Sequence, residues 1–158
     1  LDAEGSVMTP LDPRQRSTPL FQHDGSLPVI SGVNPHDFQP GRRVESPAVQ
    51  SALRLIVAFD RSPMIGLVEL RRIDVGALEV LVVTTGQGSE ITFGQQGVER
   101  QLLRWREVHD AATRMQRVVA SLDLAVPNNI PARWLEAGAL SPVPPKPAKP
   151  SRTSKKHV

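Results

Sequence analysis

Hydrophobic residues recur with helical spacing in two stretches of the chain. Residues 98–119 carry apolar side chains at steps of three and four, with charged residues between them, which predicts a long amphipathic helix. Residues 46–59 show the same spacing and begin with Ser46 and Pro47, residue types preferred at the N-cap and the first position of a helix. The sequence therefore predicts two helices. The apolar stripe of the first consists of Val49, Ala52, Leu53, Ile56 and Phe59.

Short runs rich in β-branched residues surround the two predicted helices. Residues 77–84 are almost continuously apolar, as in a central strand, whereas residues 122–126 alternate between apolar and other side chains. The predicted strands are residues 27–30, 65–73, 77–84, 90–93, 122–126 and 132–135, with a small hairpin over residues 1–8. The order of strands, helix, three strands, helix and two strands favours an α+β fold, in which a mainly antiparallel sheet carries two helices.

Composition and charge divide the chain into a domain and a tail. The 158 residues include no cysteine, which excludes disulfides, cysteine–zinc sites, iron–sulfur clusters and thiol nucleophiles. The net charge of +3 comes from residues 139–158, which hold five basic residues, no acid and five of the 15 prolines. Residues 1–138 hold 14 basic and 16 acidic residues. We therefore predict one domain over residues 1–138 and a disordered, basic, proline-rich tail over residues 139–158.

Three histidine–aspartate pairs are the main candidates for catalytic chemistry. Imidazole and carboxylate both ligate divalent ions, but two pairs lie in turn-rich segments and the third lacks a second histidine one helical turn away. The glycine-rich residues 86–88 and 94–97 lack the Gly-Lys-Ser/Thr of a phosphate-binding loop and are interpreted as turns. The sequence therefore predicts no enzyme, no metal site and no cofactor. The three pairs are His23-Asp24, His36-Asp37 and His109-Asp110.

The predicted domain ends in a strand, which suggests an open sheet edge. A last strand over residues 132–135 leaves free backbone N–H and C=O groups that can take a strand from another chain. Pro127 and Pro131 have no N–H, so each removes a donor from such a ladder. The residues alone leave two interpretations open: an edge that recruits a partner, and an edge that prolines protect.

Several short segments follow one another in an order found in a known family. Together they resemble the periplasmic β-domain of the bacterial cell-division family FtsQ, called DivIB in Gram-positive bacteria, over residues 1–137. The resemblance implies an FtsQ-type β-domain fold without catalytic activity. The segments are LDAEGSV (1–7), LPVISG (27–32), VQSALRLIVAF (49–59), the Ile73-Asp74 step, ITFG (91–94) before the helix QLLRWREV (101–108), and LDLAVPNNIPARW (122–134).

The resemblance also implies a function. Members of this family are non-enzymatic scaffolds of the divisome, the assembly that forms the division septum, and bind FtsB- and FtsL-type partners by adding a strand to the last strand of the domain. Ala125 and Val126 stand where an arginine and an aromatic residue are common, and Trp134 is expected to be the main anchor. The implied partner-binding residues are Ala125, Val126, Asn128, Asn129, Ile130, Ala132 and Trp134.

The expected location follows from the same resemblance. Family members cross the cell inner membrane once and hold this domain in the periplasm. Members also carry a transmembrane helix and a POTRA module before this domain. The chain begins with Leu1 and has no apolar run long enough to span a membrane, so the resemblance implies that both segments lie upstream. Two other functions remain as alternatives: another envelope scaffold or assembly module, and a polyanion-binding module that acts through the basic tail. A hydrolase that uses the histidine–aspartate pairs is the least favoured.

Overall fold

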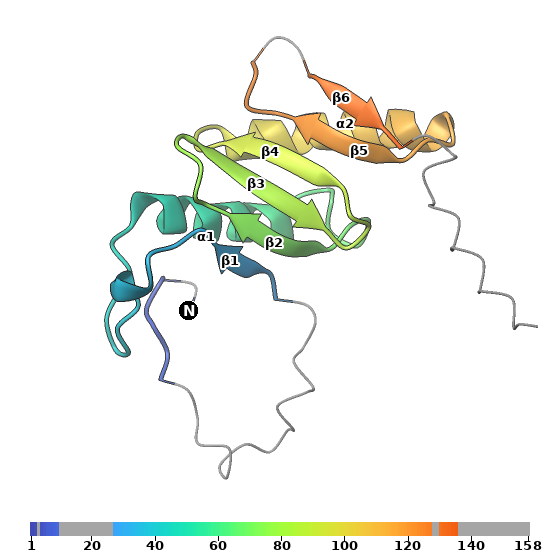
Figure 1. The fold of residues 1–158 in the computed structure, drawn as a ribbon. Helices are drawn as coiled ribbons and strands as arrows, with labels where there is room; N and C mark the ends of the chain where they lie inside the picture. The colour runs from blue at the N-terminus through green and yellow to red at the C-terminus, as the bar shows by residue number, and fades with distance from the viewer. Residues whose placement is uncertain (3, 10–26, 128–129, 136–158) are drawn as a thin grey trace, which may run out of the picture.

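The predicted helices and strands assemble into a single sheet with two helices, as seen in a computed structural model of the chain. The structure describes residues 1–2, 4–9, 27–127 and 130–135 (Figure 1). The predicted tail, residues 139–158, lies outside these residues. The elements in chain order are β1 (Val29–Ser31), the 3₁₀ helix η2 (Pro35–Asp37), α1 (Pro47–Asp60), β2 (Leu70–Asp74), β3 (Val80–Thr85), β4 (Glu90–Gly94), α2 (Val98–Arg114), β5 (Val119–Asp123) and β6 (Ala132–Trp134).

The sheet has six strands in the order in which they occur in the chain, from β1 at one edge to β6 at the other. The pairs β2–β3, β3–β4 and β5–β6 are antiparallel, whereas β1–β2 and β4–β5 are parallel. The two parallel pairs are those whose connections contain α1 and α2, as a parallel connection requires a crossover. The predicted α+β fold with a mainly antiparallel sheet is therefore confirmed.

Both helices cover the same face of the sheet (Figure 1). Their buried faces meet the inward side chains of the strands in one hydrophobic core. Trp105 of α2 joins these layers, because its ring centroid lies 6.1 Å from that of Phe59 on α1 and 5.8 Å from that of Phe93 on β4. The Phe93 contact is edge-to-face and the Phe59 contact is tilted, and such aromatic contacts stabilise the core beyond the burial of apolar area.

The predicted helices needed two corrections, whereas Ser46 is the N-cap residue as predicted. Helix α2 ends at Arg114, and Val119 begins β5, because Gln116 has a φ of 53°, which a helix does not accommodate. In α1, Leu55 is fully buried, whereas Leu53 and Ile56 are half-buried, so the core-facing stripe is rotated from the predicted one. Ser46 is the N-cap residue of α1 but makes no side-chain cap hydrogen bond.

Three predicted strands also differ from the structure. Residues 63–67 form turns and β2 begins at Leu70, so the strand predicted over residues 65–73 was too long. The predicted 122–126 strand is in fact β5, which ends at Asp123. The segment predicted to form a hairpin over residues 1–8 pairs instead with residues 41–44, since the Val7 N–H donates to the Arg42 carbonyl and the Val44 N–H donates to the Gly5 carbonyl, both near 2.9 Å. The local pattern of apolar and polar residues does not show that residues 5–7 pair with residues 42–44.

Gln101 ties the first turn of α2 to the end of β4. Its buried side chain accepts from the Gly94 N–H at 2.8 Å and donates to the carbonyls of Gln96 and Gly94 at 2.6 and 3.2 Å. We expect Gln101→Ala to lower the free energy of unfolding by about 1 to 2 kcal/mol, because it leaves buried backbone groups without partners. Urea denaturation measures this loss. The exposed neighbour Arg100 is the control, and a similar loss in Arg100→Ala would contradict the assignment.

Candidate partner-binding edge of the sheet

Strand β6 forms one edge of the sheet and pairs only with β5 among the described residues. The Asp123 N–H donates to the Pro131 carbonyl at 3.0 Å, and the Leu135 N–H donates to the Val118 carbonyl at 2.9 Å. The register places Arg133 opposite Ser121, with an irregularity in β5 between Val119 and Ser121. Backbone groups of residues 131, 133 and 135 thus face β5.

Successive residues of a strand direct their backbone groups to opposite sides. Because residues 131, 133 and 135 face β5, the N–H and C=O groups of Ala132 and Trp134 point away from the sheet. The backbone nitrogen of Pro131, which carries no hydrogen, therefore faces β5. The Pro131 carbonyl accepts a hydrogen bond in the β5–β6 ladder. The expectation that Pro131 removes a donor from a partner's ladder is therefore wrong. Pro127 lies in the bend before β6, outside the strand.

The opposite edge of the sheet, β1, is less suited to strand addition. The Val75 N–H donates to the Ser31 carbonyl at 2.9 Å, so Ser31 faces β2 and the backbone of Ile30 faces outward. The preceding outward position is Pro28, which has no N–H to donate. Pro28 thus removes one donor from the open side of β1, whereas the position of Pro131 that lacks an N–H faces β5.

The side chains predicted to bind a partner are divided between the core and the loop before β6. Ile130, Ala132 and Trp134 are half-buried and pack against the hydrophobic core. These side chains thus help to pack the domain, whereas the backbone groups of Ala132 and Trp134 face away from the sheet. Asn128 and Asn129 lie outside the described residues.

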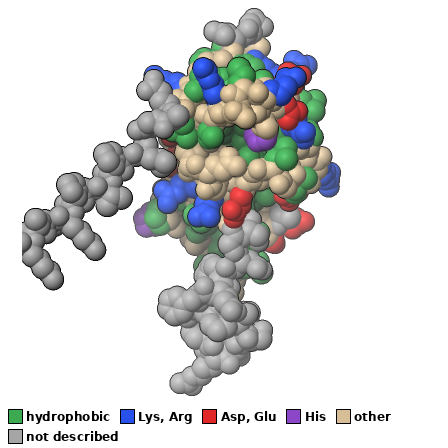
Figure 2. Space-filling view, turned by 90° about the vertical axis from the view of Figure 1, so that its right-hand side faces the viewer, with side chains coloured by type: hydrophobic (Ala, Val, Ile, Leu, Met, Phe, Trp, Pro, Cys, Tyr) green, Lys and Arg blue, Asp and Glu red, His purple; other side chains and the backbone are tan. Residues whose placement is uncertain are grey.

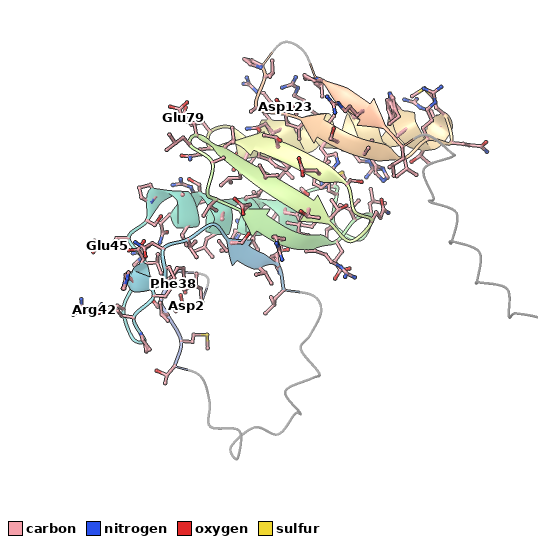
Figure 3. All side chains as sticks on the ribbon, viewed as in Figure 1. Asp2, Phe38, Arg42, Glu45, Glu79 and Asp123 are labelled. Carbon is pink, nitrogen blue, oxygen red and sulfur yellow. The ribbon has the colours of Figure 1, made fainter. Side chains whose placement is uncertain are left out.

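Ala125 and Val126 lie in the bend that follows β5. The Ala125 N–H donates to the Asp123 carboxylate at 3.0 Å, and Arg104 of α2 donates to the Val126 carbonyl at 3.1 Å. Figure 3 labels Asp123 at this end of β5. These bonds hold the bend against α2 and leave the Val126 side chain 37% exposed. Val126 is therefore the predicted residue whose side chain is most available to a partner in this bend.

The exposed side chains beside the edge include residues that sequence reasoning missed. A hollow of about 980 Å³ lies between the end of α2 and the end of β6. Met115, Val118 and Leu135 expose about half of their surface there. Side chains alternate between the two faces of a strand, so a core-facing Trp134 places Arg133 and Leu135 on the outer face. The residues that line the hollow are Met115, Gln116, Arg117, Val118, Arg133, Trp134 and Leu135.

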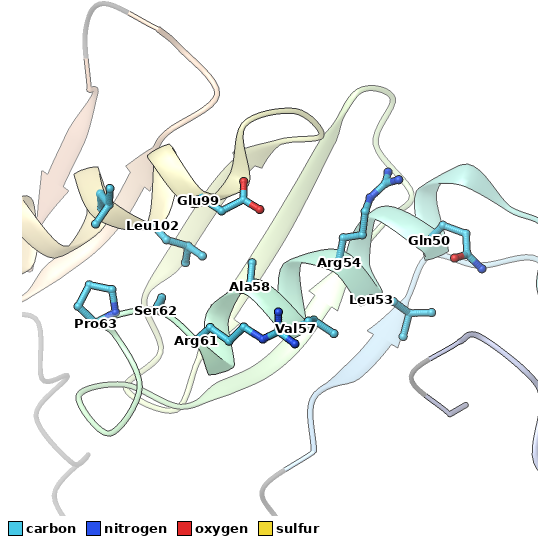
Figure 4. Close-up of a pocket in the computed structure, with 11 residues that line it drawn as sticks. Gln50, Leu53, Arg54, Val57, Ala58, Arg61, Ser62, Pro63, Glu99 and Leu102 are labelled. Atoms are coloured by element: carbon cyan, nitrogen blue, oxygen red, sulfur yellow. The ribbon is translucent and has the colours of Figure 1, made fainter.

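A groove of about 520 Å³ separates the two helices on the side away from the sheet (Figure 4). Leu53 and Val57 of α1 and Leu103 of α2 form its apolar part, and Glu99 lies at the α2 side. This groove explains why Leu53, which the sequence placed in the core, is only half-buried.

Within the described residues, the pairs His36-Asp37 and His109-Asp110 form no common metal-binding group. His36 lies in η2, and His109 and Asp110 lie on α2, with 3.8 Å between His109 Nδ1 and Asp110 Oδ1. A hydrogen bond from Arg106 lowers the pKa of Asp110. No group of three histidine, aspartate or glutamate side chains within the described residues is arranged to hold a metal ion. His23-Asp24 lies outside these residues.

No model of a protein family matches the chain, and no curated protein matches it. In the part of the chain that the structure describes, no helix is both long enough and apolar enough to cross a membrane.

Proposed function

We propose that this chain is a non-enzymatic scaffold of the bacterial divisome, of the FtsQ/DivIB type, which binds a partner by strand addition at β6. The observation that carries the proposal is the edge of β6, which pairs only with β5 among the described residues and where the backbone groups of Ala132 and Trp134 face outward. An unpaired edge of this kind supplies main-chain hydrogen bonds to an extended segment of another protein.

The neighbouring surface supports a partner with apolar side chains. Main-chain bonds give a strand its alignment, whereas pockets beside the edge select its side chains. The hollow beside β6 exposes Met115, Val118 and Leu135, with Arg117 and Arg133 at its margin. A partner strand of mixed apolar and acidic character suits this surface. We assign the role to FtsB- and FtsL-type proteins, with the domain in the periplasm beside the inner membrane that anchors the whole protein.

Hydrogen exchange tests strand addition without changing the protein. The amides of Ala132 and Trp134 face outward, whereas the amide of Arg133 faces β5. On binding an FtsB-type segment from the same genome, we expect at least tenfold slower exchange at Ala132 and Trp134, because a new ladder protects them. Arg133 is the internal control. Unchanged exchange at Ala132 and Trp134 in a formed complex would contradict strand addition at β6.

A proline substitution removes one outward donor. We expect Ala132→Pro to weaken binding of the FtsB-type segment at least tenfold, about 1.4 kcal/mol, because the partner strand loses a main-chain donor. Isothermal titration calorimetry measures the loss, and thermal unfolding verifies that the domain is folded. Ile30→Pro removes an outward N–H from the opposite edge and is the matched control. An equal loss of binding in Ile30→Pro would place the partner elsewhere.

A further inference from the structure

The groove between α1 and α2 gathers exposed apolar residues into one surface. Every third or fourth residue from Gln50 to Arg61 lines it, so it follows about three turns, or roughly 17 Å, of α1. Val57 is 38% exposed and Leu103 of α2 is 56% exposed. On the side of the molecule seen in Figure 2, hydrophobic side chains are interspersed with charges of both signs, so an exposed apolar residue alone does not mark a site. Apolar residues that are gathered between two helices are typical of a binding surface.

Exposed charges of opposite sign lie on the two helices that border the groove. Arg54 and Arg61 lie two helical turns from each other on the α1 side, whereas Glu99, in the first turn of α2, lies on the other side (Figure 4). Among the described residues, none of these three side chains forms an ion pair. An occupant of the groove is therefore expected to carry negative charge toward α1 and positive charge toward α2.

The shape of the groove favours a helix as its occupant. The backbone groups along α1 and α2 are bonded within the helices, so the two sides of the groove present side chains and offer no ladder to an extended strand. A helix that lies along α1 repeats its side chains at the same spacing, so residues seven positions from each other in its sequence reach Arg54 and Arg61 together. Apolar residues between these two then meet Leu53 and Val57.

We propose that this groove binds an amphipathic helix of another protein. The apolar stripe of that helix packs between Leu53 and Val57 on one side and Leu103 on the other. Two acidic residues, seven positions from each other, pair with Arg54 and Arg61, and a basic residue pairs with Glu99. The groove shares no residue with β6 or with the hollow beside it, so this site does not depend on the divisome function proposed above.

The test uses a stapled helical peptide of about four turns as the probe. The peptide carries a stripe of leucines, two glutamates at a spacing of seven on one flank and lysine on the other flank. The control peptide has glutamate and lysine exchanged. In NMR titrations of the full chain, the first peptide is expected to shift the amides of groove residues in a saturable manner and to bind at least tenfold more tightly than the control, because only its charges match the groove.

Variants on both helices locate the bound peptide. Arg61→Glu is expected to weaken the first peptide at least tenfold and to strengthen the exchanged peptide, whereas Leu103→Asp is expected to weaken both at least tenfold. The matched controls are Arg72→Glu, an exposed arginine on β2, and Leu78→Asp, whose leucine is 92% exposed in the β2–β3 connection. These two should change the affinity less than about twofold. Thermal unfolding verifies that each variant is folded.

Three outcomes would overturn the proposal. Equal affinity for the two peptides, or binding that survives Leu103→Asp, would mean that the groove does not recognise such a helix. Groove shifts that grow with protein concentration without peptide, together with a dimer in sedimentation, would assign the groove to a second copy of this chain. Sodium decanoate that shifts the same amides, where neither peptide does, would assign it to a small apolar anion.

Discussion

Gly32→Ala is expected to lower the free energy of unfolding by about 3 kcal/mol or more, because two costs combine at this position. Gly32 follows β1 with a φ of +77°, a conformation that side chains other than glycine rarely adopt. A Cβ there would lie 2.4 Å from the backbone nitrogen of Gly76 and 2.9 Å from Asp74 Oδ1. The backbone atom cannot move without displacing the β2–β3 connection. Urea denaturation measures the loss.

Gly41→Ala separates the two costs. Gly41 has the same φ of +77°, but a Cβ there would meet nothing within 4 Å. This variant is expected to lose only about 1 kcal/mol, the cost of the left-handed conformation alone. The difference between the two variants is then the cost of the steric clash. Equal losses would mean that the chain relaxes around residue 32 and that its close approach to Gly76 is not a constraint.

Gly32 lies beside the contacts that hold the edge strand β1 to the sheet. Ser31 Oγ donates to Asp74 Oδ2 at 3.0 Å, and the Gly76 N–H donates to Asp74 Oδ1 at 2.9 Å. Asp74 thus joins the end of β1 to the turn after β2. A side chain at residue 32 enters this junction, so the predicted loss includes the pairing of β1 with β2.

The order of the two α-helices and the six sheet strands was predictable from the sequence because these elements carry local signals, whereas the hairpin predicted over residues 1–8 was wrong. The apolar spacing gave α1 and α2, and the β-branched runs gave the central strands. The spacing failed at the end of α2, where Met115 and Val119 continue the helical pattern although the backbone turns at Gln116. The spacing of apolar residues cannot show where the backbone changes direction when the residues on both sides of the turn are apolar.

The candidate edge was predicted, but the direction of its backbone was not. A last strand often lies at a sheet edge, so the sequence favoured an edge position, and the strand order places β6 at one. Which residues face outward depends on which carbonyl meets the Asp123 N–H, and that pairing is set by the turn between β5 and β6. Because of this register, the missing N–H of Pro131 lies on the β5 side and does not block pairing at the outer edge. The indole of Trp134 packs against the core.

Trp134→Ala is expected to lower the free energy of unfolding by about 2 to 3 kcal/mol, because the indole packs against the hydrophobic core beside the buried Val119. This differs from the expectation of a mainly partner-binding side chain. Urea denaturation followed by circular dichroism measures the loss. Leu135→Ala is the matched control, since Leu135 is next in the chain, 46% exposed and outside the core, and a loss below about 0.5 kcal/mol is expected there.

Together with a third variant, Trp134→Phe, these two variants separate the roles of backbone and side chain at the edge. If the partner strand binds the outward backbone of Ala132 and Trp134, Trp134→Phe should keep both the fold and the partner's main-chain bonds, because a second aromatic ring fills most of the same space. Leu135→Ala should weaken the partner instead, because Leu135 lines the hollow beside the edge. Unchanged stability in Trp134→Ala together with lost binding would show that the indole is the partner's anchor and not part of the core.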